Sequence, residues 1–269
     1  MTVTVRLFAM LRERAGRDSV EIELPEGATV SDAFEQLAAA PGLGELVERM
    51  SLRMAVNREY ASAGTAIGPG DELALIPPIS GGAPGSGQPV DIGSPEGDKG
   101  LRVGRTHASV TEESLSTERL SAWVGDPGAG AIVTFQGVTR EVASLDYEAY
   151  REMAEERIAA ILAECVDRHG LLAAAAEHRV GRVPRGEPGV VVAVSAGHRE
   201  EAFAGAREAI DRIKAEAPIW KRELDAEGEG AWVEGAAPEP MTGAAATGAP
   251  RSEGVGPATT ARSERESAW

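Results

Sequence analysis

The chain has almost no cysteine: Cys165 is the only one among its 269 residues. A single thiol excludes an internal disulfide and every zinc site built from several cysteines. Cys165 lies between Leu162 and Val166 in an apolar helical stretch, and we interpret it as a packed core thiol rather than a reactive nucleophile. The sequence therefore predicts neither a metal site nor a catalytic cysteine.

Long apolar runs are also missing. No segment approaches the roughly 20 apolar residues that a membrane-spanning helix needs. Residues 1–6 lack the charged and then apolar layout of a secretory signal. We therefore expect a cytoplasmic protein with no membrane partner.

Positive charge is scarce relative to negative charge. The 27 Lys and Arg residues stand against 43 Asp and Glu residues, which gives a formal net charge of -16 at pH 7. Because phosphate backbones are bound through basic stripes, and the chain shows none, we expect no nucleic-acid partner. Any site for an anionic small molecule has to gather its positive charge locally.

Lysine is the scarcest charged residue, with three copies, Lys99, Lys214 and Lys221, against 24 arginines. Arginine stays protonated, whereas a lysine in a partly desolvated pocket can lose its proton and act as a general acid, base or nucleophile. Lys214 and Lys221 therefore indicate a site that needs an amine; the alternative is chance placement in a surface helix. Because Pro218 lies between them and breaks a helix, we expect them to reach one pocket from different elements.

Alternating apolar and polar residues predict strands over residues 2–7, 20–24, 52–56 and 72–76. A helix is expected from about residue 32 to residue 40, capped by Thr29 or Ser31. The stretch 14–18 suits a hairpin turn between the first two strands. The order of these elements fits a sheet wrapped over one helix.

The segment that follows this order ends in Ile79-Ser80-Gly81-Gly82. Order and ending together resemble the ubiquitin-like sulfur-carrier proteins, most closely the small subunit of molybdopterin synthase, over residues 1–82. The Gly-Gly ending is the most specific element, although a Gly-Gly pair alone also fits a flexible turn. The resemblance implies a β-grasp domain whose Gly81-Gly82 tail carries sulfur as a thiocarboxylate on Gly82.

Residues 83–100 have the composition of a flexible linker, and residues 235–269 that of a disordered tail. The remaining part, residues 101–234, forms a second predicted domain. Its expected helices and strands cover residues 114–124, 130–135, 145–150, 151–169, 190–194 and 202–215. Phe203, Ala206, Ile210 and Ile213 share a stripe of the last helix, which Pro218 ends.

Several ordered motifs of this second part resemble the large subunit of molybdopterin synthase, over about residues 101–233. They are Ile213-Lys214-Ala215-Glu216-Ala217-Pro218-Ile219-Trp220-Lys221-Arg222-Glu223, the segments 130–140 and 145–150, His178-Arg179-Val180-Gly181 and Ser195-Ala196-Gly197-His198-Arg199. The expected fold class is therefore α+β: a ubiquitin-like β-grasp domain, a linker, an α/β-hammerhead-type large-subunit domain and a disordered C-terminal tail.

The resemblance also implies roles for individual residues. Lys214, Lys221 and Gly82 are the expected catalytic residues. The expected substrate-binding residues are Val138, Thr139, Arg140, His198, Arg199, Lys214, Lys221, Arg222 and Glu223. The fork geometry of Arg140 and Arg199 suits the phosphate of a pterin substrate. His178 and Arg179 are interpreted as structural or as part of a subunit contact.

This chain departs from the large-subunit pattern at two places. The family carries a longer loop, containing Asn, His and Gly, after the position of Arg140, where only residues 141–144 remain here. Family members can also carry an arginine just after the pair that corresponds to Trp232-Val233, and none follows here. The first departure puts loop contacts to the substrate in question.

Both resemblances together imply a fused molybdopterin synthase. Such an enzyme converts cyclic pyranopterin monophosphate to molybdopterin by adding two sulfurs, one from each Gly82 thiocarboxylate, and holds no permanently bound cofactor. An adenylyltransferase would activate Gly82 with ATP, and a sulfur donor would then load it. Because a Gly82–Ala83 peptide bond leaves no free carboxylate, we expect a processing protease to cut there.

The family suggests a homodimer of the large-subunit domain with two carrier domains, in which residues of both large subunits complete each pocket. Two alternatives stay open. The N-terminal part could be a non-catalytic sulfur carrier or protein tag fused to a docking domain, which the short loop after Arg140 favours. The uncut fusion could also be an inactive reserve form.

Overall fold

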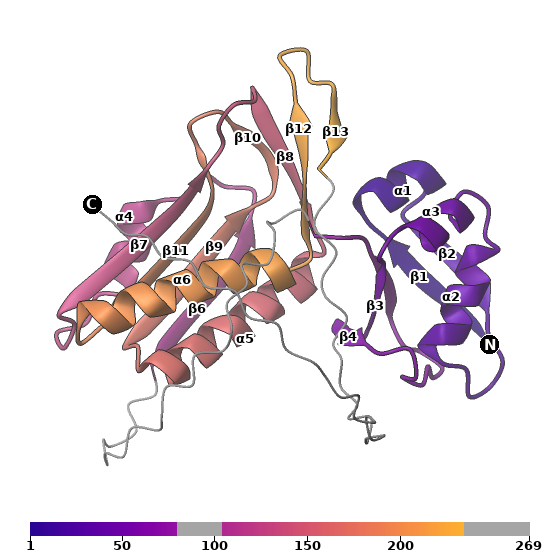
Figure 1. Ribbon diagram of the computed structural model, residues 1–269, viewed down its shortest axis with the longest axis horizontal. Helices are drawn as coiled ribbons and strands as arrows, with labels where there is room; N and C mark the ends of the chain where they lie inside the picture. Colours follow the sequence, from indigo (N-terminus) through magenta and orange to yellow (C-terminus); the bar gives the residue numbers. More distant parts are fainter. Residues whose placement is uncertain (80–103, 234–269) are drawn as a thin grey trace, which may run out of the picture. The chain divides into compact units, whose positions relative to one another are not determined.

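The computed structural model describes residues 1–79, the N-terminal region, and residues 104–233, the C-terminal region. The N-terminal region is built on a mixed five-stranded sheet with the strand order β2-β1-β5-β3-β4 (Figure 1). Its strands are β1 (Thr2–Leu7), β2 (Ser19–Glu23), β3 (Arg53–Val56), β4 (Glu59–Ala61) and β5 (Leu73–Ile76). Strand β1 pairs antiparallel with β2 and parallel with β5. The four predicted strands are confirmed, and β4 is an addition.

Three helices accompany this sheet: α1 (Ala9–Ala15), α2 (Val30–Ala38) and α3 (Gly44–Arg49). Thr29 caps α2, because its side chain and that of Asp32 form a reciprocal capping box. Leu37 of α2 packs in one core cluster with Val5 of β1 and Leu75 of β5. A sheet packed on this helix is the ubiquitin-like arrangement that the sequence predicts.

The predicted hairpin turn over residues 14–18 is wrong. Helix α1 occupies the connection between β1 and β2, and it is built from residues with good helix propensity, such as Leu11 and Arg12. Gly16 ends α1 with a left-handed φ of 63°, and its N–H bonds to the carbonyl of Glu13. The two strands are antiparallel neighbours although a helix joins them.

The C-terminal region contains two four-stranded sheets, with the orders β6-β9-β11-β7 and β10-β8-β12-β13. The strands of the first sheet are β6 (Arg105–Thr111), β7 (Ala131–Val138), β9 (Ala173–Arg179) and β11 (Pro188–Ala196). Those of the second sheet are β8 (Ser144–Ala149), β10 (Gly181–Pro184), β12 (Ile219–Leu224) and β13 (Gly230–Trp232). The predicted strands correspond to β7, β8 and β11.

Helices cover both faces of the first sheet (Figure 1). They are α4 (Thr117–Trp123), α5 (Arg151–His169) and α6 (Arg199–Glu216). Because successive side chains of a strand point to opposite faces, Ala174 and Val192 belong to the core cluster that includes residues of α5 and α6. Ala173 and Val191 pack in a separate cluster with residues of α4. The buried first sheet thus separates two hydrophobic layers.

Two helix predictions are confirmed at their ends. Helix α5 has the predicted bounds, and Gly170 ends it with a φ of 61°. Helix α6 ends at Glu216, before Pro218, as predicted. Phe203, however, is 63% exposed instead of belonging to the buried stripe. The buried face of α6 runs through residues such as Ala202 and Ala209, and Phe203 lies about a quarter turn from its centre.

Cys165 is fully buried on α5, and burial raises its pKa to about 12, which agrees with a packed core thiol. Over the described residues, no helix is long and apolar enough to cross a membrane. The same residues include no group of three or more His, Cys, Asp or Glu side chains placed to hold a metal ion. The predicted linker and tail, together with Gly81, Gly82 and Ala83, lie outside the described residues.

Candidate functional site

A cavity of about 420 Å³ lies where helix α6 ends beside strands of both sheets of the C-terminal region. Its lining includes three cationic side chains, two carboxylates and one histidine: Arg140, Lys214, Lys221, Glu141, Glu223 and His178. Apolar residues such as Ile213 and Ile219 form the rest of the wall. In a chain with a net charge of -16, this excess of cations provides the local positive charge that an anionic ligand requires.

The two lysines reach this cavity from different elements. Lys214 lies in the last turn of α6 and is exposed, with its Nζ atom 5.5 Å from the centre of the Phe135 ring. Lys221 lies on β12 and is half-buried. Pro218 separates the helix from the strand, so the structure places the two amines as the sequence predicts.

Strand β12 carries cavity residues on one face only. Lys221 and Glu223 line the cavity, whereas Arg222 between them points to the opposite face, as alternation along a strand requires. Arg222 bonds to Asp146 of β8 at 3.0 Å, and its guanidinium lies 5.5 Å from the centre of the Trp232 ring. Arg222 is therefore not brought together with the lysines.

The segment at the end of β7 contributes Val138 and Arg140 to the cavity, but not Thr139. Thr139 is 2% exposed and turns its hydroxyl into the interior, where Oγ1 has no hydrogen-bond partner in the described part of the chain. Arg140 is exposed, and its Nε atom lies 3.8 Å from a carboxylate oxygen of Glu141. Its guanidinium remains accessible to an anion in the cavity.

His178, on β9, also lines the cavity, whereas the sequence indicates a structural role or a subunit contact for it. Its side chain is only 8% exposed, and its ring meets that of Tyr147 edge-on at 5.0 Å. Burial, with a further contribution from the charge of Lys214, lowers the pKa of His178 to about 4. Alternation with the buried Ala174 and Ala176 would have indicated that His178 faces the α6 side of the sheet.

His198 and Arg199 lie at the other end of α6. His198 is the residue before the helix, Arg199 is its first residue, and both are exposed. At 1.5 Å per residue, the 15 steps from Arg199 to Lys214 correspond to about 22 Å along the axis. Within one chain, these two residues are not brought to the cavity.

The end of the N-terminal region forms part of the cavity wall through Ile79. Just before it, the carbonyl of Pro77 accepts a hydrogen bond of 3.1 Å from the indole N–H of Trp220. Phe8 stacks on Trp220 and Tyr150, with ring centres 5.3 Å and 4.9 Å apart. The face of β12 that points away from the cavity therefore binds the N-terminal region.

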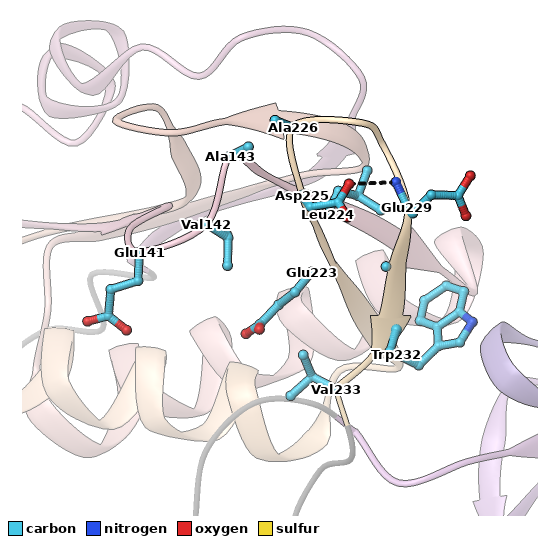
Figure 2. Close-up of a pocket in the computed structure, with 12 residues that line it drawn as sticks. Glu141, Val142, Ala143, Glu223, Leu224, Asp225, Ala226, Glu229, Trp232 and Val233 are labelled. Carbon is cyan, nitrogen blue, oxygen red and sulfur yellow. Dashed lines mark hydrogen bonds between the residues drawn. The ribbon is translucent and has the colours of Figure 1, made fainter.

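A second, more open hollow of about 690 Å³ adjoins the cavity and shares Glu141 and Glu223 with it (Figure 2). The short segment 141–143 forms one side of it, and the β12–β13 hairpin forms the other. In this hairpin, Asp225 accepts a hydrogen bond of 2.9 Å from the backbone N–H of Glu229. The segment after Arg140, where the resemblance leads us to expect a longer loop, thus borders the open hollow beside the lysine cavity.

Comparison with known proteins assigns both regions to families. Residues 110–216 match the family described as MoaE protein, and residues 5–82 match the ThiS family. A molybdopterin synthase catalytic subunit from Thermoplasma volcanium is 43% identical over 133 residues, which are 47% of this chain and 97% of that protein. One from Oryza sativa subsp. indica is 49% identical over 121 residues, 43% of this chain and 63% of that protein.

A crystal structure of molybdopterin synthase from Staphylococcus aureus is also similar. It is 32% identical, and the similarity covers 46% of this chain and 95% of that chain, with a TM-score of 0.44.

Proposed function

The chain belongs to the family of molybdopterin synthase catalytic subunits and carries a ThiS-family domain before it, and we propose that it is a fused molybdopterin synthase. In this proposal it converts cyclic pyranopterin monophosphate to molybdopterin. The two sulfurs of the product come from thiocarboxylates on Gly82 of two carrier domains. The proposal makes the chain a sulfurtransferase that acts in molybdenum cofactor biosynthesis.

One observation supports this proposal above all others: Ile79 lines the same cavity as Lys214 and Lys221. Gly82 follows Ile79 by three residues, and three residues span at most about 10 Å. The glycine pair has no side chains that would hinder entry into a narrow space. The carrier tail therefore starts within reach of the two amines.

The roles of the residues follow from their chemistry. Lys214 is the acid/base or electrostatic group nearest the acyl group, and Lys221 supports it. Attack by the thiocarboxylate sulfur forms a carbon–sulfur bond on the pterin side chain while a carbon–oxygen bond of the same carbon breaks, and the departing oxygen takes up a proton. Water then cleaves the acyl–sulfur bond, which leaves the sulfur on the substrate and Gly82 as a carboxylate. Arg140 binds the substrate phosphate through its guanidinium.

His198 and Arg199 enter this scheme only through a second copy of the chain. Because they lie about 22 Å along α6 from Lys214, one chain cannot bring all three to one small substrate. A homodimer of the catalytic domain, with a carrier at each end, would let the partner copy supply them. Of Thr139, Arg222 and Glu223, only Glu223 lies in the cavity wall and keeps its predicted substrate role in the proposal. Thr139 is buried and Arg222 pairs with Asp146 on the opposite face of β12, so the proposal gives neither of them a substrate contact.

Loading of Gly82 requires partners. An adenylyltransferase that uses ATP activates the carboxylate, and a sulfur donor displaces AMP, so the synthase itself holds no permanent cofactor. A processing protease must first free the carboxylate by cutting between Gly82 and Ala83. We place these steps in the cytoplasm.

The proposal is tested with protein purified from its native host and mixed with cyclic pyranopterin monophosphate. Molybdopterin formation by a preparation that contains chains ending at Gly82 would support it. If active preparations contain only full-length chain, the cleavage step is wrong. If chains that carry sulfur on Gly82 never form molybdopterin, the chain is a carrier or tag fused to a docking domain. If cut chains are active and the uncut chain is inactive, the uncut chain is a reserve form.

A further inference from the structure

In His178, the buried histidine of the cavity, one ring nitrogen is hydrogen-bonded and the other has no hydrogen-bond partner among the described residues. The Nδ1 atom of His178 lies 2.8 Å from the backbone carbonyl oxygen of Arg179. Its Nε2 atom has no hydrogen-bond partner among the described residues. Thr139 Oγ1 is an example of an atom that is fully enclosed and has no hydrogen-bond partner, but Nε2 of His178 is not fully enclosed. Because the His178 side chain lines the cavity, Nε2 can be reached from there.

The engaged nitrogen fixes the tautomer of the ring. A carbonyl oxygen can only accept a hydrogen bond, so Nδ1 must carry the proton and donate it to Arg179. The low pKa of His178 keeps the ring neutral at physiological pH. Nε2 is then an unprotonated acceptor with its lone pair free.

The surroundings of the ring do not offer Nε2 another partner. Tyr147 meets the imidazole edge-on, at a ring distance of 5.0 Å. The other titratable or charged groups of the cavity are Arg140, Glu141, Lys214, Lys221 and Glu223, and no hydrogen bond joins any of them to His178 in the described chain. An acceptor that opens to the cavity and has no partner within the described chain is available to an N–H or O–H group of a molecule that enters the cavity.

We propose that His178 is a substrate-binding residue of this cavity, whose Nε2 atom accepts a hydrogen bond from an N–H or O–H group of the bound substrate. This inference rests on the proposed function, since it concerns the pterin substrate of the same site. A pterin offers several N–H donors, and an acceptor on a rigid, buried strand can select their orientation. The residue thus contributes to specificity rather than to the sulfur transfer itself.

Two substitutions separate this role from a structural one. In His178→Asn, the side-chain amide can replace Nδ1 as the donor to Arg179 but has no atom at the position of Nε2. In His178→Gln, the amide oxygen can reach the position of Nε2. With the full chain and cyclic pyranopterin monophosphate, we expect His178→Asn to raise KM roughly tenfold with little change in kcat, and His178→Gln to recover most of the loss.

The matched control is His107→Asn, because His107 pairs with Glu177 and lies outside the cavity. Its KM should equal that of the unchanged chain. Equal KM values for His178→Asn and the unchanged chain would overturn the proposal while molybdopterin formation still supports the function. Independently of activity, NMR of the imidazole nitrogens should show the proton on Nδ1, and a proton on Nε2 would also overturn the proposal.

Discussion

The two faces of strand β12 differ in what they bind. One face presents Lys221 and Glu223 to the cavity. The other presents Trp220, which donates a hydrogen bond to Pro77 of the N-terminal region, and Arg222, which bonds to Asp146. Four consecutive residues of one motif therefore serve two tasks, because strand geometry sends alternate side chains to opposite faces.

This difference links the position of the N-terminal region to that of the lysine cavity. A single strand holds both the amine of Lys221 and the indole of Trp220, which bonds to Pro77 of the N-terminal region, and a strand is a rigid spacer. Any shift of the N-terminal region would move Ile79 relative to Lys221. The comparison predicts that changes on the cavity face affect the reaction, and changes on the other face affect docking or stability.

The largest expected effect comes from Lys214 on the cavity side. Lys214→Arg keeps the positive charge but removes a group that can release a proton, so we expect molybdopterin formation to fall by about 10² to 10⁴-fold, and we expect the same of Lys214→Ala. Arg207→Ala is the matched control, since Arg207 lies on the same helix, is 84% exposed and lies outside the cavity wall. Single-turnover rates check this, and full activity in Lys214→Arg would show that charge alone is needed.

On the opposite face, Trp220→Ala should be strongly destabilising. Trp220 is 1% exposed and packs with Phe8, so its loss removes a large buried side chain and leaves the carbonyl of Pro77 without its donor. We expect a loss of about 3 to 5 kcal/mol in the free energy of unfolding. Urea unfolding followed by fluorescence measures it. Trp220→Phe, which keeps most of the packing, should cost less, and equal costs would contradict the packing role assigned to the Trp220 ring.

Part of the pH dependence of stability should come from His178 on the cavity side. Burial lowers the pKa of His178 to about 4, whereas an unfolded histidine has a pKa of about 6.5. Between these values the unfolded chain binds a proton that the folded chain does not, so stability is lost as the pH falls through this range, by up to about 3 kcal/mol. Urea unfolding at several pH values should show this slope, and His178→Asn should lack this part of it.

Much of this arrangement could be predicted where local patterns agree with the fold. The periodicity of α5 and its terminal Gly170 predict that helix to the residue. Strand β9 begins with four alanines, which favour a helix, and only burial between two helical layers makes it a strand. The sequence therefore indicates only a structural role or a subunit contact for His178, since its place in the cavity depends on a strand that the sequence does not predict.

The two predicted lysines line one cavity, whereas the sequence was less informative about their neighbours. The motif around Lys221 does not say which side chains face inward until a strand is assigned to it. The resemblance assigns His198, Arg199 and Lys214 to one substrate site. In the structure, His198 and Arg199 lie at the start of α6, whereas Lys214 lies in its last turn. Distances of this kind depend on tertiary structure, or on a second copy of the chain, and cannot be derived from spacing alone.

The smallest effect is expected for Arg222→Ala. The ion pair of Arg222 with Asp146 is partly exposed, and such pairs contribute about 0 to 1 kcal/mol. Because Arg222 lies outside the cavity wall and its ion pair contributes little to stability, molybdopterin formation should stay within about twofold of the unchanged chain. A steady-state assay next to Lys221→Ala checks this. A large loss of activity in Arg222→Ala would mean that the face of β12 away from the cavity also takes part in the reaction.

The central claim is that the sulfur on Gly82 is delivered into the cavity of Lys214 and Lys221. Intact-mass spectrometry of host-purified protein, before and after addition of cyclic pyranopterin monophosphate, tests it directly. We expect a fragment that ends at Gly82 with one oxygen replaced by sulfur, and the replacement of that sulfur by an oxygen from water as the substrate gains sulfur. A sulfur-bearing Gly82 that persists in the presence of substrate would contradict it.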